Sequence, residues 1–252
     1  MEEHTKESGH WYKKDGTPAY TIIGKNGKER NTTLRDARKE GLLPSVTSII
    51  RCAAAPGLEN WKSQQVLMAA LTTSRLPNES EQEYIDRIIK DSQEQALKAR
   101  ERGTLIHAWV QSGFEGKPFD VDDAAKYYES AKAALELACL ESPIWICEKA
   151  FAEERYGGKV DLHTEDGYVV DIKTTEKDLT NIKTWEEHAM QLAAYSMGIL
   201  GTLGACAILY INVLNAESKA IWITEDELDK GWKMFSALLD YYYAKTGLGR
   251  EN

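Results

Sequence analysis

The chain has 252 residues, of which 42% are hydrophobic, and a formal net charge of −9 at pH 7. This composition predicts a globular protein with a substantial core, arranged as one large domain or two small ones. No apolar run is long enough to span a membrane, and the acidic, polar start lacks the hydrophobic region of a signal peptide. We therefore expect a cytoplasmic protein without a membrane partner. The acidic charge excludes broad, tight, non-specific binding to duplex DNA but not a local basic groove.

Residues 1–45 are predicted to form an N-terminal arm, because turn signals interrupt every periodic pattern in it. The segment 10–20 is expected to be a short hairpin. Basic residues follow over 25–39, but acidic residues dilute them. An ordinary solvated surface and a DNA-contacting arm are equally good interpretations of this segment.

Residues 46–140 are predicted to be helical. A helix that Ser45 or Thr47 can cap runs to about Leu71 by its apolar spacing. Amides exposed at a helix start can bind a phosphate, although simple capping explains the same residues. One or two helices are expected over 80–115, and another over 121–140. A lone histidine in such a helix, His107, is usually a core or surface residue.

Residues 141–252 alternate between strand and helix patterns and are predicted to form an α/β core. Strands are expected at 144–151, 205–213 and 220–224, and helices at 185–200 and 225–245. The continuous apolar run at 205–213 is typical of a strand buried on both faces. Glu148, on the first strand, fits either a salt bridge at a strand edge or a further metal or water ligand.

A hairpin is expected between the strands at 144–151 and 205–213. If Glu165, Asp166 and Gly167 form a three-residue loop, Asp161 opposes Asp171, and Lys173 shares their face because side chains alternate with period 2. Gly167 then occupies the loop position that needs a left-handed backbone. A two-residue Asp-Gly turn would instead point Asp161 to the other face.

The chemistry of these residues favours the longer loop. Two facing carboxylates hold a hard divalent cation, and a lysine beside them can hold or polarise a water molecule. Charges within an apolar strand need partners or a metal, which disfavours a plain surface hairpin. Gln191 and Tyr195, at i and i+4, share one face of the following helix. The set predicts metal-assisted hydrolysis of phosphodiester bonds.

The ordered set Gly-Gly-x-x-Asp at 157–161, Val-Asp-Ile-Lys-Thr at 170–174 and Gln-x-x-x-Tyr at 191–195 resembles the PD-(D/E)XK nuclease superfamily. The branch is that of the RecB nuclease domain and lambda-type phage exonucleases. Val160 stands where the family name has proline. The resemblance implies one nuclease domain over 1–252, with a restriction-endonuclease-like α/β core whose central mixed β-sheet is flanked by helices, plus an N-terminal helical part.

The resemblance also implies roles for particular residues. Asp161, Asp171 and the Ile172 carbonyl would bind the metal, and Lys173 would be the catalytic lysine, with Gln191 and Tyr195 completing the site. RecB-like nucleases carry a Gly-Thr-x-x-His motif whose histidine contacts a metal. Gly103, Thr104 and His107 match this motif, although Gln111 stands where relatives often have an acid. The expected further metal ligands are His107 and Glu148, and the expected nucleic-acid contacts are Ser45, Thr47, Arg102 and Thr104.

The activity that this resemblance implies is a Mg2+- or Mn2+-dependent DNA exonuclease of phage or prophage type, acting in recombination, replication or repair in the host cytoplasm. Its partners would be DNA and a phage single-strand annealing or DNA-binding protein. Some RecB-like nucleases hold an iron–sulfur cluster, but the clustered C-terminal cysteines are missing here, so none is expected. The alternatives are a structure-specific or restriction-like endonuclease and a non-catalytic DNA-binding accessory protein.

Overall fold

The computed structural model describes residues 10–53, 56–119, 121, 123–137 and 143–249. The chain separates into two compact units, one formed by Met1–Ala53 with Trp109–Asn252 and the other by Ala54–Ala108. The first unit holds a mixed β-sheet with its flanking helices. The second holds α3 (Pro56–Thr72) and most of α4 (Glu81–Phe114). No helix in the described part of the chain is both long and apolar enough to cross a membrane.

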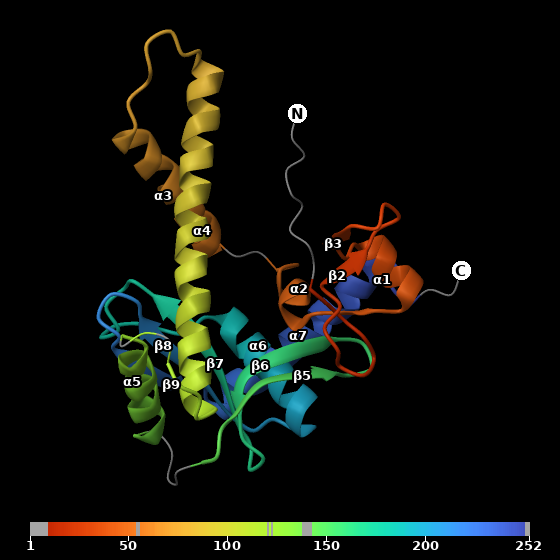
Figure 1. Ribbon diagram of the computed structural model, residues 1–252. Helices are drawn as coiled ribbons and strands as arrows, with labels where there is room; N and C mark the ends of the chain where they lie inside the picture. The colour runs from red at the N-terminus through yellow and green to blue at the C-terminus, as the bar shows by residue number, and fades with distance from the viewer. Residues whose placement is uncertain (1–9, 54–55, 120, 122, 138–142, 250–252) are drawn as a thin grey trace. The chain divides into compact units, whose positions relative to one another are not determined.

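The sheet of the first unit has five strands in the order β5-β6-β7-β8-β9 (Figure 1). Their bounds are Ile146–Ala152, Gly157–His163, Tyr168–Thr175, Ala205–Asn212 and Ser218–Trp222. Strands β7 and β8 run parallel, and the other neighbouring pairs run antiparallel. The expected mixed α/β sheet flanked by helices is confirmed.

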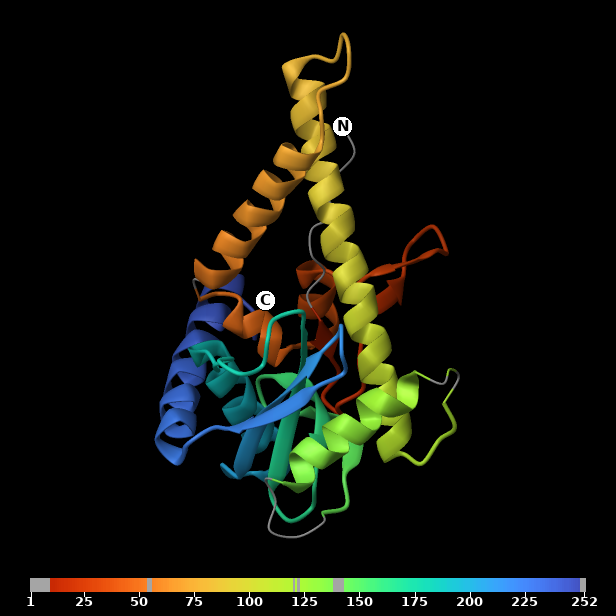
Figure 2. The same ribbon diagram turned by 90° about the vertical axis from the view of Figure 1, so that its left-hand side faces the viewer.

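Helices cover both faces of this sheet (Figure 2). On one face α6 (Glu186–Leu200) packs against β6, β7 and β8, and α7 (Glu225–Thr246) packs against α6. On the other face α5 (Ala124–Glu136) contacts β8 and β9. The long hydrophobic strand β8 is buried from Cys206 to Asn212, as its apolar run predicts.

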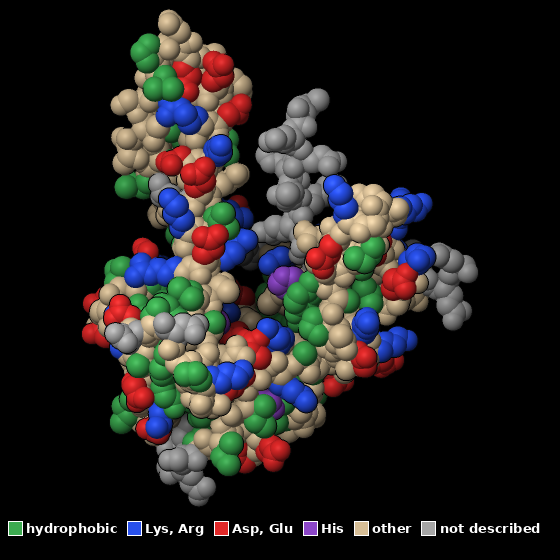
Figure 3. All heavy atoms as spheres, viewed as in Figure 1, with side chains coloured by type: hydrophobic (Ala, Val, Ile, Leu, Met, Phe, Trp, Pro, Cys, Tyr) green, Lys and Arg blue, Asp and Glu red, His purple; other side chains and the backbone are tan. Residues whose placement is uncertain are grey.

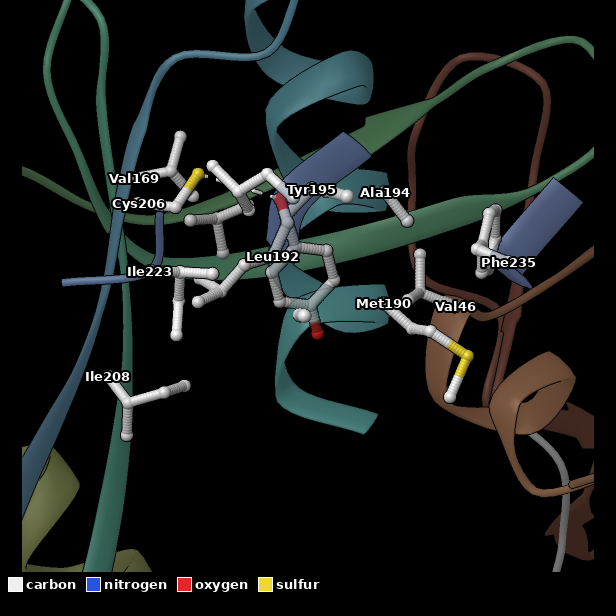
Figure 4. Packing of buried hydrophobic residues seen from close by; sticks show 14 of the residues in the cluster. Val46, Val169, Met190, Leu192, Ala194, Tyr195, Cys206, Ile208, Ile223 and Phe235 are labelled. Carbon is white, nitrogen blue, oxygen red and sulfur yellow. Dashed lines mark hydrogen bonds between the residues drawn. The ribbon is translucent and has the colours of Figure 1, made fainter. Parts of the chain in front are cut away.

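The main core fills the space between α6 and the sheet. Figure 4 shows Leu192 of α6 facing Val169 of β7 and Cys206 of β8, while Phe235 extends the cluster towards α7. These side chains are buried because alternate strand residues and every third or fourth helix residue point the same way. The core thereby fixes α6 over β7, the strand that carries Asp171 and Lys173.

Helices α6 and α7 approach closely at Gly231. A Cβ atom at this position would lie 2.6 Å from the backbone carbon and oxygen of Ala189 and 2.9 Å from the nitrogen of Met190. Because backbone atoms cannot rotate away, Gly231→Ala should destabilise the fold by about 1–3 kcal/mol despite the better helix propensity of alanine. Gly57→Ala is the matched control, since nothing lies within 4 Å of its added Cβ. Equal urea midpoints for both variants would contradict this packing.

The N-terminal arm has more structure than the sequence patterns predict. Strand β1 (Trp11–Tyr12) pairs with β4 (Leu43–Pro44), and β2 (Thr21–Ile23) forms a hairpin with β3 (Glu29–Asn31). The expected hairpin over 10–20 is a turn closed by the bridge between Tyr12 and Pro18. Helix α1 (Leu34–Glu40) was not expected, although the capping box of Thr33 and Asp36 marks its start.

The basic residues of this arm are interspersed with acidic ones (Figure 3). The Arg30 guanidinium makes two hydrogen bonds to the Asp36 carboxylate, at 2.7 and 2.8 Å, and Lys39 forms an ion pair with Glu40. These ion pairs neutralise part of the positive charge of the arm.

The predicted helix from Ser45 to about Leu71 is wrong. Helix α2 covers only Val46–Ile50, and α3 begins at Pro56. Proline lacks the N–H that a continuing helix needs, and it disfavours a helical backbone in the residue before it. Of the one or two helices expected over 80–115, the structure has one, α4, and residues 138–140 of the expected 121–140 helix lie outside the described residues.

Candidate active site

The hairpin of β6 and β7 has the register that the chemistry predicted. Leu162 pairs with Val170, His163 pairs with Val169, and the Thr164 N–H donates to the Tyr168 carbonyl at 3.0 Å. The loop therefore contains three residues, and Gly167 has a positive φ of 113°. Residue 161 accordingly stands opposite residue 171.

The two strands separate where the aspartates begin. Backbone pairing of β6 with β7 ends at Leu162 and Val170, and β7 continues as the parallel partner of β8. The Asp161 carboxylate accepts the N–H of Ile172 at 2.7 Å and so takes the place of a backbone acceptor. Asp161 is thus held by the neighbouring strand, with its carboxylate on the side of Asp171.

Gln191 links the aspartate and the lysine of β7 to helix α6. Its Nε2 donates to Asp171 Oδ1 at 2.7 Å and to the Tyr195 hydroxyl at 3.0 Å, while its Oε1 accepts from Lys173 Nζ at 3.3 Å. Lys173 Nζ also lies 2.6 Å from Asp171 Oδ2. The structure therefore gathers Asp161, Asp171, Lys173, Gln191 and Tyr195 into one polar cluster.

The pKa values in this cluster are shifted by burial and by neighbouring charges. Burial and the facing Asp171 carboxylate raise the pKa of Asp161 to about 7. Burial lowers the pKa of Lys173, but the charge and close contact of Asp171 together with the charge of Asp161 raise it more, so the net pKa lies above the ordinary value. The ammonium is therefore charged at neutral pH. A proton shuttle through Lys173, which needs a lowered pKa, is disfavoured.

The Gly-Gly pair of the sequence motif has a packing role. A Cβ at Gly157 would lie 2.7 Å from Tyr12 Cβ, and one at Gly158 would lie 2.7 Å from the Phe151 ring and 3.0 Å from the Tyr195 ring. These glycines let three aromatic rings approach β6 directly. Gly158 thereby allows Tyr195 to reach the polar cluster.

Glu148 lies opposite Asp161 in the register of β5 and β6, but the two do not form a backbone pair. Glu148 has a left-handed backbone with φ of 54°, which interrupts the ladder at this point. Its carboxylate forms an ion pair with Lys159 of β6. The salt bridge that the sequence allowed is present, while a metal role for Glu148 stays a prediction.

Ser45 and Thr47 lie at the start of α2. Ser45 forms a β-bridge with Gly157 at the start of β6, and its hydroxyl accepts the Ser48 N–H at 3.1 Å. Ser45 is therefore the N-cap, and the Thr47 hydroxyl lies 3.1 Å from the Ser45 hydroxyl. Simple capping accounts for both residues, and a phosphate contact stays a prediction.

Arg102, Thr104 and His107 lie on the part of α4 that belongs to the second unit. Arg102 and Thr104 are exposed, and His107 is half-buried. Their expected roles in metal and nucleic-acid binding stay predictions.

Two residues near the cluster were not singled out from sequence. His188 lies one turn before Gln191 on α6, and Tyr210 is the strand neighbour of Lys173 on β8. The Tyr210 hydroxyl lies 3.3 Å from His188 Nδ1. Burial and the charge of Lys173 lower the pKa of His188 and keep its ring neutral. The spacing of residues 188, 191 and 195, which places all three on one helix face, is the sequence signal that could have identified His188.

The donor chemistry of the cluster fits a hard divalent cation. Asp171 Oδ2 is buried and accepts no hydrogen bond of ordinary geometry from any described residue. Mg2+ is commonly held by one or two carboxylates, with water and substrate phosphates as its other ligands. No group of three His, Cys, Asp or Glu side chains suited to a metal occurs among the described residues.

The raised pKa of Asp161 predicts how stability depends on pH without a divalent cation. Its ordinary value is 3.8 and its folded value about 7, so the folded state binds the proton more tightly than the unfolded chain. The free energy of unfolding should therefore fall as pH rises from about 4 to about 7 and then level off. Each pKa unit between the unfolded and folded values of Asp161 corresponds to about 1.4 kcal/mol in the free energy of unfolding.

Thermal melts in EDTA check this expectation. Asp161→Asn should be more stable than the parent protein at about pH 8, and the difference should narrow towards about pH 5. Asp166→Asn, in the exposed loop of the same hairpin, is the control and should show no such trend. A parent protein as stable as Asp161→Asn at about pH 8 would contradict the assigned environment.

No family model matches the chain, and no curated protein matches it. One similar solved structure is the "Putative exonuclease" from Eubacterium rectale, with 16% identity and a TM-score of 0.42 over 59% of this chain and 69% of that one. Another is the protein named SSO0001, with 14% identity and a TM-score of 0.31 over 72% of this chain and 86% of that one. Because both scores are low, the functional argument depends on the geometry of the site.

Proposed function

We propose that this protein is a metal-dependent deoxyribonuclease with a PD-(D/E)XK-type core that degrades DNA from its ends. The observation that carries the proposal is the cluster of Asp161, Asp171 and Lys173 on one hairpin, joined to α6 through Gln191. A partly buried set of charges contributes little to stability, because desolvation offsets the attraction between them. A carboxylate with a raised pKa, such as Asp161, beside a lysine is instead typical of catalytic sites.

Each residue has a role that follows from its contacts. Asp161 and Asp171, with the Ile172 carbonyl, would hold Mg2+ or Mn2+. Bound there, the cation would lower the pKa of a water molecule and neutralise charge on the scissile phosphate. Lys173, charged at neutral pH, would stabilise the negative charge that develops on the phosphate oxygens. Gln191 fixes Lys173 and Asp171 relative to each other, and Tyr195 holds the Gln191 amide.

Sequence-specific cleavage is not expected. No motif that reads duplex DNA, such as a zinc finger or a helix-turn-helix, is evident in the sequence. Contacts would therefore be made mainly to phosphates, which position DNA without distinguishing bases. A role in phage recombination, replication or repair, with a single-strand annealing protein as partner, belongs to the same proposal.

The test compares end-labelled linear DNA with covalently closed circles of the same sequence, in Mg2+ and in EDTA. The proposal expects the linear DNA to be degraded in Mg2+, the circles to be spared, and no cleavage in EDTA. Nicking of closed circles would replace it with an endonuclease. DNA binding without cleavage in Mg2+ would replace it with an accessory protein. Asp171→Asn controls for a contaminating nuclease.

A further inference from the structure

The segment 176–184 connects β7, which carries Lys173, to α6, which carries Gln191. Side chains from β8 and β9 donate hydrogen bonds to its backbone carbonyls. These are Asn212 Nδ2 to Lys177 O (3.1 Å), the Tyr210 hydroxyl to Lys183 O (3.0 Å), and Lys219 Nζ to Leu179 O (3.0 Å) and Thr180 O (3.1 Å). Leu179 is also buried in the main core. The segment is therefore fixed to the sheet along its length.

Trp185 follows this segment and begins α6 as its N-cap. Its side chain is 62% exposed, although its backbone is held by hydrogen bonds. The Trp185 N–H donates to His188 Nδ1 at 3.2 Å, and the Tyr210 hydroxyl lies 3.3 Å from the same nitrogen. Tyr210 is in turn the strand neighbour of Lys173. A large aromatic ring is thus attached to the same elements as the catalytic cluster while contributing little to the core.

The charges around Trp185 indicate what kind of ligand this surface suits. Exposed lysines and acids are mixed here, with Lys177 and Lys183 among Glu176, Asp178, Glu186 and Glu187. Lys230 of α7 forms an ion pair with Glu186. Such a mixture attracts phosphates weakly, so the ring is the main feature that can bind. A flat ligand with an accessible π-face, such as an unpaired nucleobase, matches a preorganised indole.

We propose that Trp185 is a stacking platform for an unpaired nucleobase of the strand held at the catalytic cluster. This inference rests on the proposed nuclease function and adds a preference for single-stranded DNA next to the site. The anchoring of segment 176–184 lowers the entropy lost on binding, because the platform is ordered before the strand arrives. Stacking is tolerant of base identity, which agrees with cleavage that does not depend on sequence.

The test measures DNA binding apart from cleavage. In the Asp171→Asn background, fluorescence anisotropy with a labelled oligothymidylate should show that Trp185→Ala weakens binding about 5- to 100-fold, while Trp185→Phe retains most of the affinity. An oligomer of the same length made of abasic sugars should bind equally well with and without the Trp185→Ala substitution, because it offers no base to stack. Tyr241→Ala, which removes an exposed aromatic ring from α7, is the control and should leave both affinities unchanged.

Three outcomes would overturn the inference. Unchanged oligothymidylate binding by Trp185→Ala would show that the ring makes no contact. Equal losses of affinity for oligothymidylate and for the abasic oligomer would show that the substitution weakens contacts to the sugar-phosphate chain rather than base stacking. An equal loss on a blunt duplex would assign the ring to duplex ends. Binding that depends on Trp185 in a protein that never cleaves DNA would refute the nuclease proposal alone.

Discussion

Asp171→Asn should reduce DNA cleavage in Mg2+ by about 1,000-fold or more, and Asp161→Asn should have the same effect. A neutral amide is a poor ligand for a hard cation, and these two carboxylates are the proposed side-chain ligands. At position 171 the change also removes the negative charge beside Lys173, while the remaining amide oxygen can still accept the hydrogen bond from Gln191. Initial rates on end-labelled linear DNA measure the loss.

Both variants should fold, because each substitution keeps the size of the side chain and removes one of two facing charges. Circular dichroism and thermal melting in EDTA check this directly. Asp166→Asn, in the exposed loop of the same hairpin, is the matched control and should retain the parental rate. Full activity in either site variant would remove the aspartates from the mechanism, whereas loss of folding would leave Lys173 as the independent test.

The register of the central hairpin could be predicted because two independent constraints agree. The alternation of side chains requires a three-residue loop if Asp161 and Asp171 are to share a face, and Gly167 can adopt the positive φ that such a loop needs. Strand β8 was equally accessible to prediction, since its continuous apolar run distinguishes a strand covered on both sides. Local pattern and long-range packing lead to the same answer in these elements.

The sequence patterns failed where a local signal competed with periodicity. The apolar spacing continues from Ser45 to Leu71, but the backbone cannot remain helical through Pro56. Helix α1 was not predicted although Thr33 and Asp36 form a capping box, because turn signals interrupt the periodic patterns of the arm. In both cases one or two residues determine the local secondary structure against a longer sequence pattern.

Other properties of the site depend on distances that no sequence pattern contains. The left-handed backbone of Glu148 and its ion pair with Lys159 arise where the ladder of β5 and β6 is interrupted at one position. The direction of the Lys173 pKa shift depends on the balance between burial and the nearby Asp171, and only the structure supplies both. The aromatic rings that require Gly157 and Gly158 likewise come from separate parts of the chain.

The second large effect is expected at Lys173. Lys173→Ala should lower the cleavage rate about 100- to 1,000-fold while leaving Mg2+ binding largely intact, because it removes a positive charge and not a metal ligand. Lys173→Arg should not restore the rate. The lysine ammonium lies 2.6 Å from Asp171 Oδ2 and 3.3 Å from Gln191 Oε1, and a wider planar guanidinium does not fit the same two contacts.

Cleavage assays and calorimetric titration with Mg2+, run on the same samples, separate the two functions. Lys149→Ala is the control, because Lys149 is an exposed lysine on β5 and should affect neither measurement. The raised pKa of Lys173 adds a further expectation: the cleavage rate should show no deprotonation of this residue near neutral pH. Retained cleavage with lost Mg2+ binding in Lys173→Ala would reverse the assignment, since the lysine would then organise the cation site rather than stabilise charge on the phosphate.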